Sequence, residues 1–462
     1  MSAAHEAYLA ERYDRHLGEL VEYLRIPSIS TLPQHAADIG RCADWVAAHL
    51  ESIGIRDVEQ LETGGNPIVF GELLEAGPAA PTLLVYGHYD VQPADPLELW
   101  RTPPFEPTIR DGQIYARGAT DNKGPLFVYL KALETLIAVD GGLACNVKVL
   151  IEGEEELRAD NLDTFMENER ERLRCDALVI SDSAQYAKGV PSIPLSLRGM
   201  AALQLRLETA STDLHSGMYG GVAPNALDAL VRLLATLRDE RGVVAVEGFY
   251  DGVEPPAAEE VRRWEELPFD PEELREQIGA KLLIGEDGEH GPLERMWKRP
   301  TLDLHGVWGG FSGEGIKTVI PREAHAKLSC RLVPHQEPQP LLDRLVEHLE
   351  RHCPAEASLT IEWTLPGATP IEMSRDDPLV RAAEAALAAT YGRPPLFFRS
   401  GWSVPVAEIA KRRLGVDPLL LGFGLPEDGA HAPNEQFALE SFELGTRTMI
   451  EFFSRCADSA HA

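Results

Sequence analysis

The stretch "TLLVYGHYDVQPAD", from Thr82 to Asp95, joins an apolar strand to a polar site. The apolar and β-forming residues from Thr82 to Gly87 predict a buried strand of a parallel sheet. His88 and Asp90 follow at the carboxyl end of that strand, where functional groups of α/β sheets gather. Because side chains alternate along a strand, both point to the same face, roughly 7 Å apart. One His–x–Asp pair is weak evidence by itself, so its meaning depends on the other strand ends.

Polar groups also follow other predicted strands. "GQIYARGATDNKGP" places Asp121 in a glycine-rich turn before a helix, and "VLIEGEEELRAD" places residues 154–156, all glutamates, after a strand. Asp182 ends "LVISDS", and His431 lies in the loop "GFGLPEDGAHAPNE". Taken singly, these groups are better explained as a helix cap, a solvated loop and a turn former. Taken together they need another account, because crowded carboxylates repel one another unless cations neutralise them.

Two divalent metal ions would neutralise such a cluster. Mixed imidazole and oxygen ligands suit zinc, with manganese and cobalt as alternatives. Two ions a few Å apart share a bridging carboxylate and activate a water molecule for attack on a carbonyl or phosphoryl group. The strand ends therefore predict a hydrolase with two metal ions.

The order of predicted elements indicates a discontinuous α/β domain. Strands and helices alternate through residues 1–192, change to an α+β pattern over residues 193–375, and alternate again over residues 376–462. We therefore expect a catalytic domain in two parts, 1–192 and 376–462, with a second domain, 193–375, inserted in it. Apolar periodicity predicts helices at 39–53, 124–139, 226–237, 340–351, 376–391, 404–413 and from 439 onward.

The composition excludes several classes of protein. A formal net charge of −31 disfavours nucleic acid and anionic membranes as partners. The six cysteines are scattered without a CxxC pair, which argues against disulfides and thiolate zinc sites and favours buried free thiols. No apolar run is long enough to cross a bilayer, and the amino-terminal segment lacks the apolar core of a signal peptide, so a cytoplasmic protein is expected.

Several long motifs, in the same order along nearly the whole chain, resemble the M20 metallopeptidases, and in particular their group of cytosolic nonspecific dipeptidases and carnosinases. They are "GHYDVQP", "PPFEPTIRDGQIYARGATDNKGP", "EGEEE", "ISDS", "LRG", "DLHSGMYGG", "GFSGEGIKTVIP", "CRLVP" and "GAHAPNE". The resemblance implies an α/β fold in which a catalytic domain with a mixed, mainly parallel sheet is interrupted by an inserted α+β lid. It also implies a two-zinc centre, a small peptide substrate and a homodimer formed through the lid.

The resemblance also implies a role for each residue of the metal centre. His88 and Asp182 would bind one ion, Glu156 and His431 the other, and Asp121 would bridge both. The peptide bond after Asp121 would be cis.

Two carboxylates beside these ligands would act without binding metal. Asp90 would hold the imidazole of His88 in the correct tautomer. Glu155 would be the general base, taking a proton from the attacking water and giving it to the leaving amine. A one-residue shift in the run of three glutamates would give this role to Glu154 instead.

In the inserted domain, the resemblance implies that His215, supplied by the partner subunit, stabilises the oxyanion. Thr318 and Arg331 would hold the carboxylate of the substrate, for which the planar fork of arginine is suited.

The substrate loop departs from the family pattern, since "RSGWSVP" stands at residues 399–405 where the family commonly has "REGGSIP". Ser403 and His431 would contact substrate. Trp402 would either line the pocket or pack into the core.

The expected function is therefore hydrolysis of the amide bond of dipeptides or short peptides. The alternative within the family is an amidohydrolase acting on acetyl, succinyl or carbamoyl amino acids. The alternative from another class is a catalytically inactive binding protein, which the presence of every expected ligand and of Glu155 disfavours.

Overall fold

The computed structural model describes residues 1–157, 160–284, 289–401 and 404–459. The chain forms two compact units, which are described separately. The first unit comprises residues 1–195, 373–398 and 404–462, and the second comprises residues 196–372 and 399–403.

A six-stranded sheet organises the first unit, in the order β1-β2-β6-β3-β7-β18. β3 pairs in parallel with β6 and β7, and β18 pairs in parallel with β7, whereas β2 is antiparallel to β1 and β6. The predicted mixed, mainly parallel sheet is confirmed. The strands are β1 (Arg56–Leu61), β2 (Ile68–Leu73), β3 (Thr82–His88), β6 (Asn146–Glu152), β7 (Ala177–Ile180) and β18 (Pro418–Leu420).

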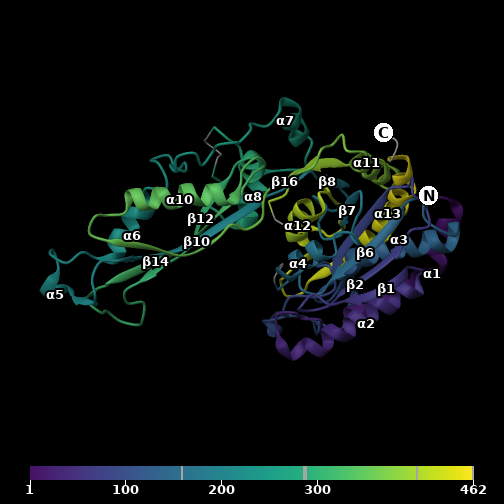
Figure 1. Ribbon diagram of the computed structural model, residues 1–462, viewed down its shortest axis with the longest axis horizontal. Coiled ribbons are helices and arrows are strands. Elements are labelled where there is room, and N and C mark those ends of the chain that lie inside the picture. Colours follow the sequence, from purple (N-terminus) through teal and green to yellow (C-terminus); the bar gives the residue numbers. More distant parts are fainter. Residues whose placement is uncertain (158–159, 285–288, 402–403, 460–462) are drawn as a thin grey trace. The chain divides into compact units, whose positions relative to one another are not determined.

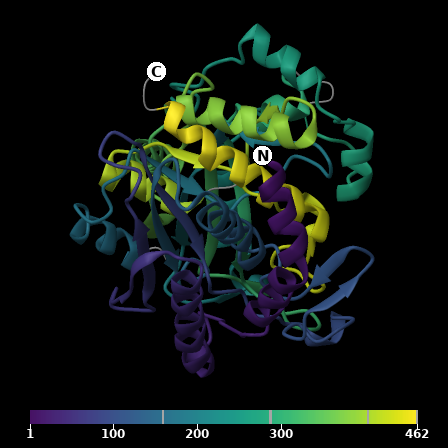
Figure 2. The same cartoon turned by 90° about the vertical axis from the view of Figure 1, so that its right-hand side faces the viewer.

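Helices cover this sheet because its inner strands β3, β6 and β7 are apolar on both faces (Figure 1). α3 is buried along nearly its whole length and packs against α1 and α13, and α13 packs against α11 (Figure 2). α12 packs with α4 and contacts β7 and β18. The bounds are α1 (Ala3–Leu24), α2 (Ala36–Ser52), α3 (Lys123–Asp140), α4 (Asp160–Asn168), α11 (Pro378–Tyr391), α12 (Pro405–Leu414) and α13 (Leu439–Ser459).

The second unit is built on a four-stranded antiparallel sheet, in the order β12-β14-β10-β15. Alternate residues of β10 are buried against α6 and α10, so one face of the sheet forms the core of this unit. A short pair, β11 with β13, continues from one end of the β10–β14 ladder. The bounds are β10 (Gly199–Glu208), β11 (Leu214–His215), β12 (Thr301–Gly309), β13 (Val319–Ile320), β14 (Glu323–Leu332), β15 (Ser358–Leu365), α6 (Ala226–Ala235) and α10 (Pro338–His352).

The predicted helices lie within a few residues of their observed positions, but several elements were not predicted, including those described next. The edge strand β1 is mostly exposed and carries charged residues, so it lacks the apolar signal of the inner strands. The acidic, proline-rich region of residues 240–300 contains three short helices, α7 (Ala258–Glu265), α8 (Pro271–Ile278) and α9 (Pro292–Trp297).

Within the described ranges, every helix is too short or too polar to span a lipid bilayer. All six cysteines are free; four are buried as expected, whereas Cys175 and Cys353 are only half-buried.

A buried lysine joins the first three long helices of the first unit. The Nζ atom of Lys131 donates to Glu19 at 2.5 Å, Glu134 at 2.7 Å and the Nε2 atom of His49 at 3.0 Å. This set of two glutamates and a histidine resembles a metal site, but the ammonium group already supplies its positive charge. Burial, together with the charge of Lys131, lowers the pKa of His49 to about 3.

The stability of the protein is expected to depend on His49 between pH 6.5 and about 3. In this window the unfolded chain binds a proton at His49 and the folded chain does not, so the free energy of unfolding falls as the pH falls. The contribution is about 1.4 kcal/mol per pH unit. Urea unfolding at several pH values should therefore give a shallower dependence for His49→Gln than for the wild type. The exposed His352→Gln serves as the control, and equal slopes for wild type and His49→Gln would contradict the expectation.

Candidate metal centre

The predicted site residues of the first unit follow neighbouring parallel strands. His88 is the last residue of β3, Asp182 follows β7, and Glu155 and Glu156 follow β6. Because β6, β3 and β7 are adjacent and parallel, their carboxyl ends meet at one edge of the sheet. Asp121 reaches this edge from the turn before α3.

These side chains form two groups that can each hold a metal ion. One group is His88, Glu155 and Asp182, and the other is Asp121, Glu156 and His431. Within each group the ligand atoms lie within 4.8 Å of one another.

Asp121 belongs to the second group and faces the histidine of each group. Its Oδ1 atom is 3.1 Å from the Nε2 atom of His88, and its Oδ2 atom is 2.9 Å from the Nε2 atom of His431. A carboxylate whose two oxygens face two imidazoles has the geometry of a bridging ligand. The Asp121–Asn122 peptide bond is cis, as the family resemblance predicted.

Asp90 is fully buried behind His88 and contacts three separate segments. Its Oδ1 atom is 3.4 Å from the Nδ1 atom of His88, and its two oxygens accept hydrogen bonds from the backbone N–H groups of Glu155 and Glu156. Ser30 donates to Oδ2 at 2.6 Å. Asp90 therefore orients an imidazole and at the same time holds the glutamate loop.

The adjacent glutamates 154 and 155 point to different surroundings. Glu154 accepts a hydrogen bond of 2.7 Å from the Nδ2 atom of Asn161 and takes no part in either group. Glu155 lies with His88 and Asp182. Glu155, to which the resemblance assigned the general base, is therefore the one beside the other site residues, whereas the alternative Glu154 is not.

The carboxylates of the site are forced close together. Burial, with the charges of Asp182, Glu156 and Asp121, raises the pKa of Glu155 well above its usual value, although His88 opposes this shift. Burial and the charge of Asp121 raise the pKa of Asp182 to about 7. Additional positive charge at this place would stabilise both carboxylates in their ionised form.

The pKa values of the two histidines are raised, which favours their positively charged forms. Burial lowers the pKa of His88, but its bonds to Asp121 and Asp90 outweigh burial and raise the pKa well above the usual value. Bonds to Asp121 and Glu156 raise the pKa of His431 to about 10. Positive charge is therefore favoured at both imidazoles, next to the carboxylates.

The donor set fits two divalent cations. Each group offers one imidazole nitrogen and carboxylate oxygens, which are ligands of zinc and also of manganese and cobalt. A cation in each group would relieve the repulsion that raises the carboxylate pKa values.

Several polar residues of the centre were not singled out from the sequence. Gln92 donates to Glu156 at 2.7 Å, and Ser181 donates to Asn122 at 2.8 Å, beside Asp182. The buried Glu435 accepts hydrogen bonds from the turn that carries Asp121. Gln92 and Glu435 stand in the quoted motifs "GHYDVQP" and "GAHAPNE". Their place in these motifs could have identified them as residues of the centre.

The predicted residues of the second unit lie at opposite ends of its sheet. His215 pairs with Val319 across β11 and β13, next to Thr318, whose carbonyl oxygen accepts from the backbone N–H of Ser216. Arg331 lies near the other end of β14. Trp402 and Ser403 lie outside the described residues.

His215 is exposed, and its ring has a defined tautomer. Its Nδ1 atom accepts a hydrogen bond of 3.0 Å from the backbone N–H of Gly217. The proton of the neutral ring therefore stays on Nε2, which can donate to a ligand.

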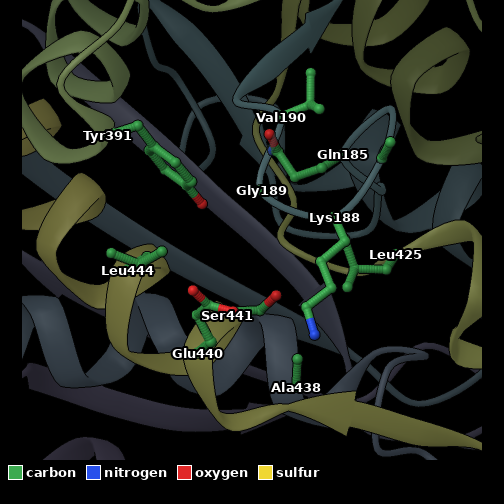
Figure 3. Close-up of a pocket in the computed structure, with 11 residues that line it drawn as sticks. Gln185, Lys188, Gly189, Val190, Tyr391, Leu425, Ala438, Glu440, Ser441 and Leu444 are labelled. Carbon is green, nitrogen blue, oxygen red and sulfur yellow. The ribbon is translucent and has the colours of Figure 1, made fainter. Parts of the chain in front are cut away.

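A small pocket elsewhere in the first unit is too small to bind a peptide (Figure 3). Its volume is about 10 Å³, which is space for about one water molecule. Gln185 lies in its wall and donates to the carbonyl of Gly422 at 2.6 Å, which ties the segment after Asp182 to the segment after β18.

Comparison with known proteins shows the family of this chain and its relatives. The model of peptidase family M20/M25/M40 matches residues 84–455. Human Beta-Ala-His dipeptidase is 31% identical over 467 residues, covering 97% of this chain and 92% of the human protein. Cys-Gly metallodipeptidase DUG1 of Candida albicans is 31% identical over 96% of this chain and 94% of its own length.

Two solved structures are also similar to this chain over nearly its whole length. Human carnosine dipeptidase 1 has a TM-score of 0.82 at 30% identity, covering 99% of both chains. An M20 family metallo-carboxypeptidase from Sulfolobus solfataricus has a TM-score of 0.84 at 32% identity, covering 96% of this chain and 99% of its own. The similarity extends through both units.

Proposed function

The chain belongs to peptidase family M20/M25/M40, and from this membership we propose that it is a metallodipeptidase with two zinc ions. The position of Asp121 carries the proposal, because its two oxygens face the imidazoles of His88 and His431 at 3.1 and 2.9 Å. The names of its relatives at 31% identity, Beta-Ala-His dipeptidase and Cys-Gly metallodipeptidase, support dipeptides as substrates. They do not favour acylated amino acids.

In this proposal His88 and Asp182 would hold one ion, Glu156 and His431 would hold the other, and Asp121 would be a ligand of both. When bound, two such ions would polarise the scissile carbonyl and make water a nucleophile at neutral pH. The Nδ1 atom of His88 lies 3.1 Å from the backbone carbonyl oxygen of Asp90 and 3.4 Å from its carboxylate, so Asp90 keeps the proton on Nδ1 and leaves the lone pair of Nε2 for a ligand.

Glu155 transfers the proton. It takes a proton from the attacking water as the C–O bond forms, and gives it to the amine nitrogen as the C–N bond breaks. Burial raises its pKa, and its acidic neighbours raise the pKa further as long as no cation offsets their charge.

The second unit serves in the proposal as lid and dimerisation domain. His215 donates from Nε2 to the carbonyl oxygen as negative charge develops. Thr318 and Arg331 bind the carboxylate of the substrate.

The geometry of the second unit supports a homodimer. The strand β14 separates Glu323 from Arg331 by roughly 26 Å, and His215 and Thr318 lie beyond Glu323, at the end that carries α5 (Ser216–Tyr219) (Figure 1). A dipeptide is about 7 Å long. One rigid unit cannot bring both ends of its sheet to one dipeptide, so a second copy would supply one of them.

A substrate panel tests the function. The purified protein, loaded with zinc, is expected to hydrolyse dipeptides such as β-Ala-His and Cys-Gly, to lose that activity on chelation, and to regain it when zinc is restored. N-acetyl, N-succinyl and N-carbamoyl amino acids are the comparison substrates.

Turnover of an acylated amino acid without cleavage of any dipeptide would show that the substrate class is wrong. Dipeptide cleavage that survives complete metal removal would show that the mechanism is wrong. The cytoplasmic location and the absence of nucleic acid partners remain predictions from the sequence.

A further inference from the structure

A single buried carboxylate joins the two loops that carry Asp121 and His431. Glu435 is 0% exposed and accepts four hydrogen bonds from residues 117–121. Its Oε1 atom accepts from the backbone N–H groups of Thr120 at 2.9 Å and Asp121 at 3.0 Å. Its Oε2 atom accepts from the Nη1 atom of Arg117 at 2.7 Å and the backbone N–H of Gly118 at 2.9 Å. We call this arrangement the Glu435 clamp.

A second carboxylate of the same loop contacts the same turn. The buried Asp428 accepts from the hydroxyl group of Thr120 at 3.0 Å and from the backbone N–H of Leu425 at 2.7 Å. The segment 425–435 is therefore joined to the turn of Asp121 at two places, and His431 lies between them. Asp121 and Glu435 are 314 positions apart in the sequence.

We propose that Glu435 is a positioning residue for the metal ion held by Asp121, Glu156 and His431. This inference rests on the proposed metal centre and extends it. Glu435 lies in the loop that carries one ligand, His431, and accepts a hydrogen bond from the backbone N–H of another ligand, Asp121. It thereby fixes the separation of two ligands that come from distant parts of the chain, before any ion binds.

The other metal group depends less on the clamp. His88 and Asp182 follow the adjacent parallel strands β3 and β7, whose ladder sets their separation. Of the residues proposed to bind that ion, only Asp121 is held by Glu435. Loss of the clamp should therefore weaken the two sites unequally.

Replacement of Glu435 by glutamine is the direct test. Glutamine has nearly the same size but only one acceptor oxygen, whereas each carboxylate oxygen of Glu435 receives two donors. In either orientation the new NH₂ group faces two donors. The exposed Glu427→Gln, in the same loop, is the matched control because it removes a charge without touching the clamp.

Metal binding gives a readout that does not depend on activity. Chelated wild type, Glu435→Gln and Glu427→Gln are titrated with Co²⁺, and its visible absorption is followed through both binding steps. His431→Ala identifies the step that belongs to its site, because that step is lost. In Glu435→Gln this step is expected to weaken by about 10- to 100-fold, with a smaller change in the other step and none in Glu427→Gln.

Equal weakening of both steps, or a lower melting temperature with unchanged Co²⁺ binding, would overturn the proposal. A wild type that binds fewer than two Co²⁺ ions would instead refute the metal centre itself.

Hydrogen exchange of the chelated wild type provides a test that needs no variant. The amides of Gly118, Thr120 and Asp121 should stay protected without metal, since their N–H groups donate hydrogen bonds to Glu435. Exchange at the rate of an exposed loop would also overturn the proposal.

Discussion

Glu155→Gln is expected to lower kcat by about 10²- to 10⁴-fold while both metal ions remain bound. Glutamine keeps the shape of the side chain but cannot take a proton from water at neutral pH. The expected loss is in kcat, because the proposed role of Glu155 concerns proton transfer and not substrate binding. Steady-state kinetics on a dipeptide, with metal content measured on the same sample, checks both parts.

Glu154→Gln is the matched control. The carboxylate of Glu154 accepts from Asn161 and belongs to neither metal group, so this variant should keep nearly wild-type turnover. If Glu154→Gln were the inactive variant, the assignment would be wrong by one residue. If Glu155→Gln lost a metal ion, Glu155 would be a ligand together with His88 and Asp182.

His215→Ala is expected to lower kcat by about 10²- to 10³-fold with unchanged metal content. The physical reason is the loss of the Nε2 donor that would meet the developing oxyanion. Unchanged turnover would remove His215 from the proposed site.

Mixing two inactive variants tests whether His215 acts in the partner subunit. Subunits of His215→Ala and Glu155→Gln are exchanged in equal amounts. If His215 acts across the interface, each mixed dimer has one complete site, and about one quarter of the wild-type activity should return. If His215 acts within its own chain, every site lacks one residue and no activity returns.

The elements with a regular apolar pattern were predictable from the sequence. The strand β3 and the helices α3, α11 and α12 lie close to where their apolar residues placed them, because burial in the core favours such residues. The exposed strand β1 and the short helices of residues 240–300 have little apolar periodicity, and they were missed.

The metal centre was predictable only in part. Polar residues after apolar strands pointed to one edge of the sheet, and the residues expected to bind metal lie together there. Their individual roles remain predictions. The resemblance assigned the general base to Glu155 but left a one-residue shift to Glu154 open, because the directions of three adjacent glutamate side chains depend on how the loop leaves β6.

The sequence by itself determined the family, the α/β class and the residues able to bind metal, since these follow from local patterns and motifs. Only the tertiary structure decided that Asp121 lies between His88 and His431, that Asp90 holds the glutamate loop, and that Glu435 bonds the turn of Asp121. The physical reason is that these contacts join residues far apart in the chain. Their distances are set by how the strands and loops pack, which no local pattern records.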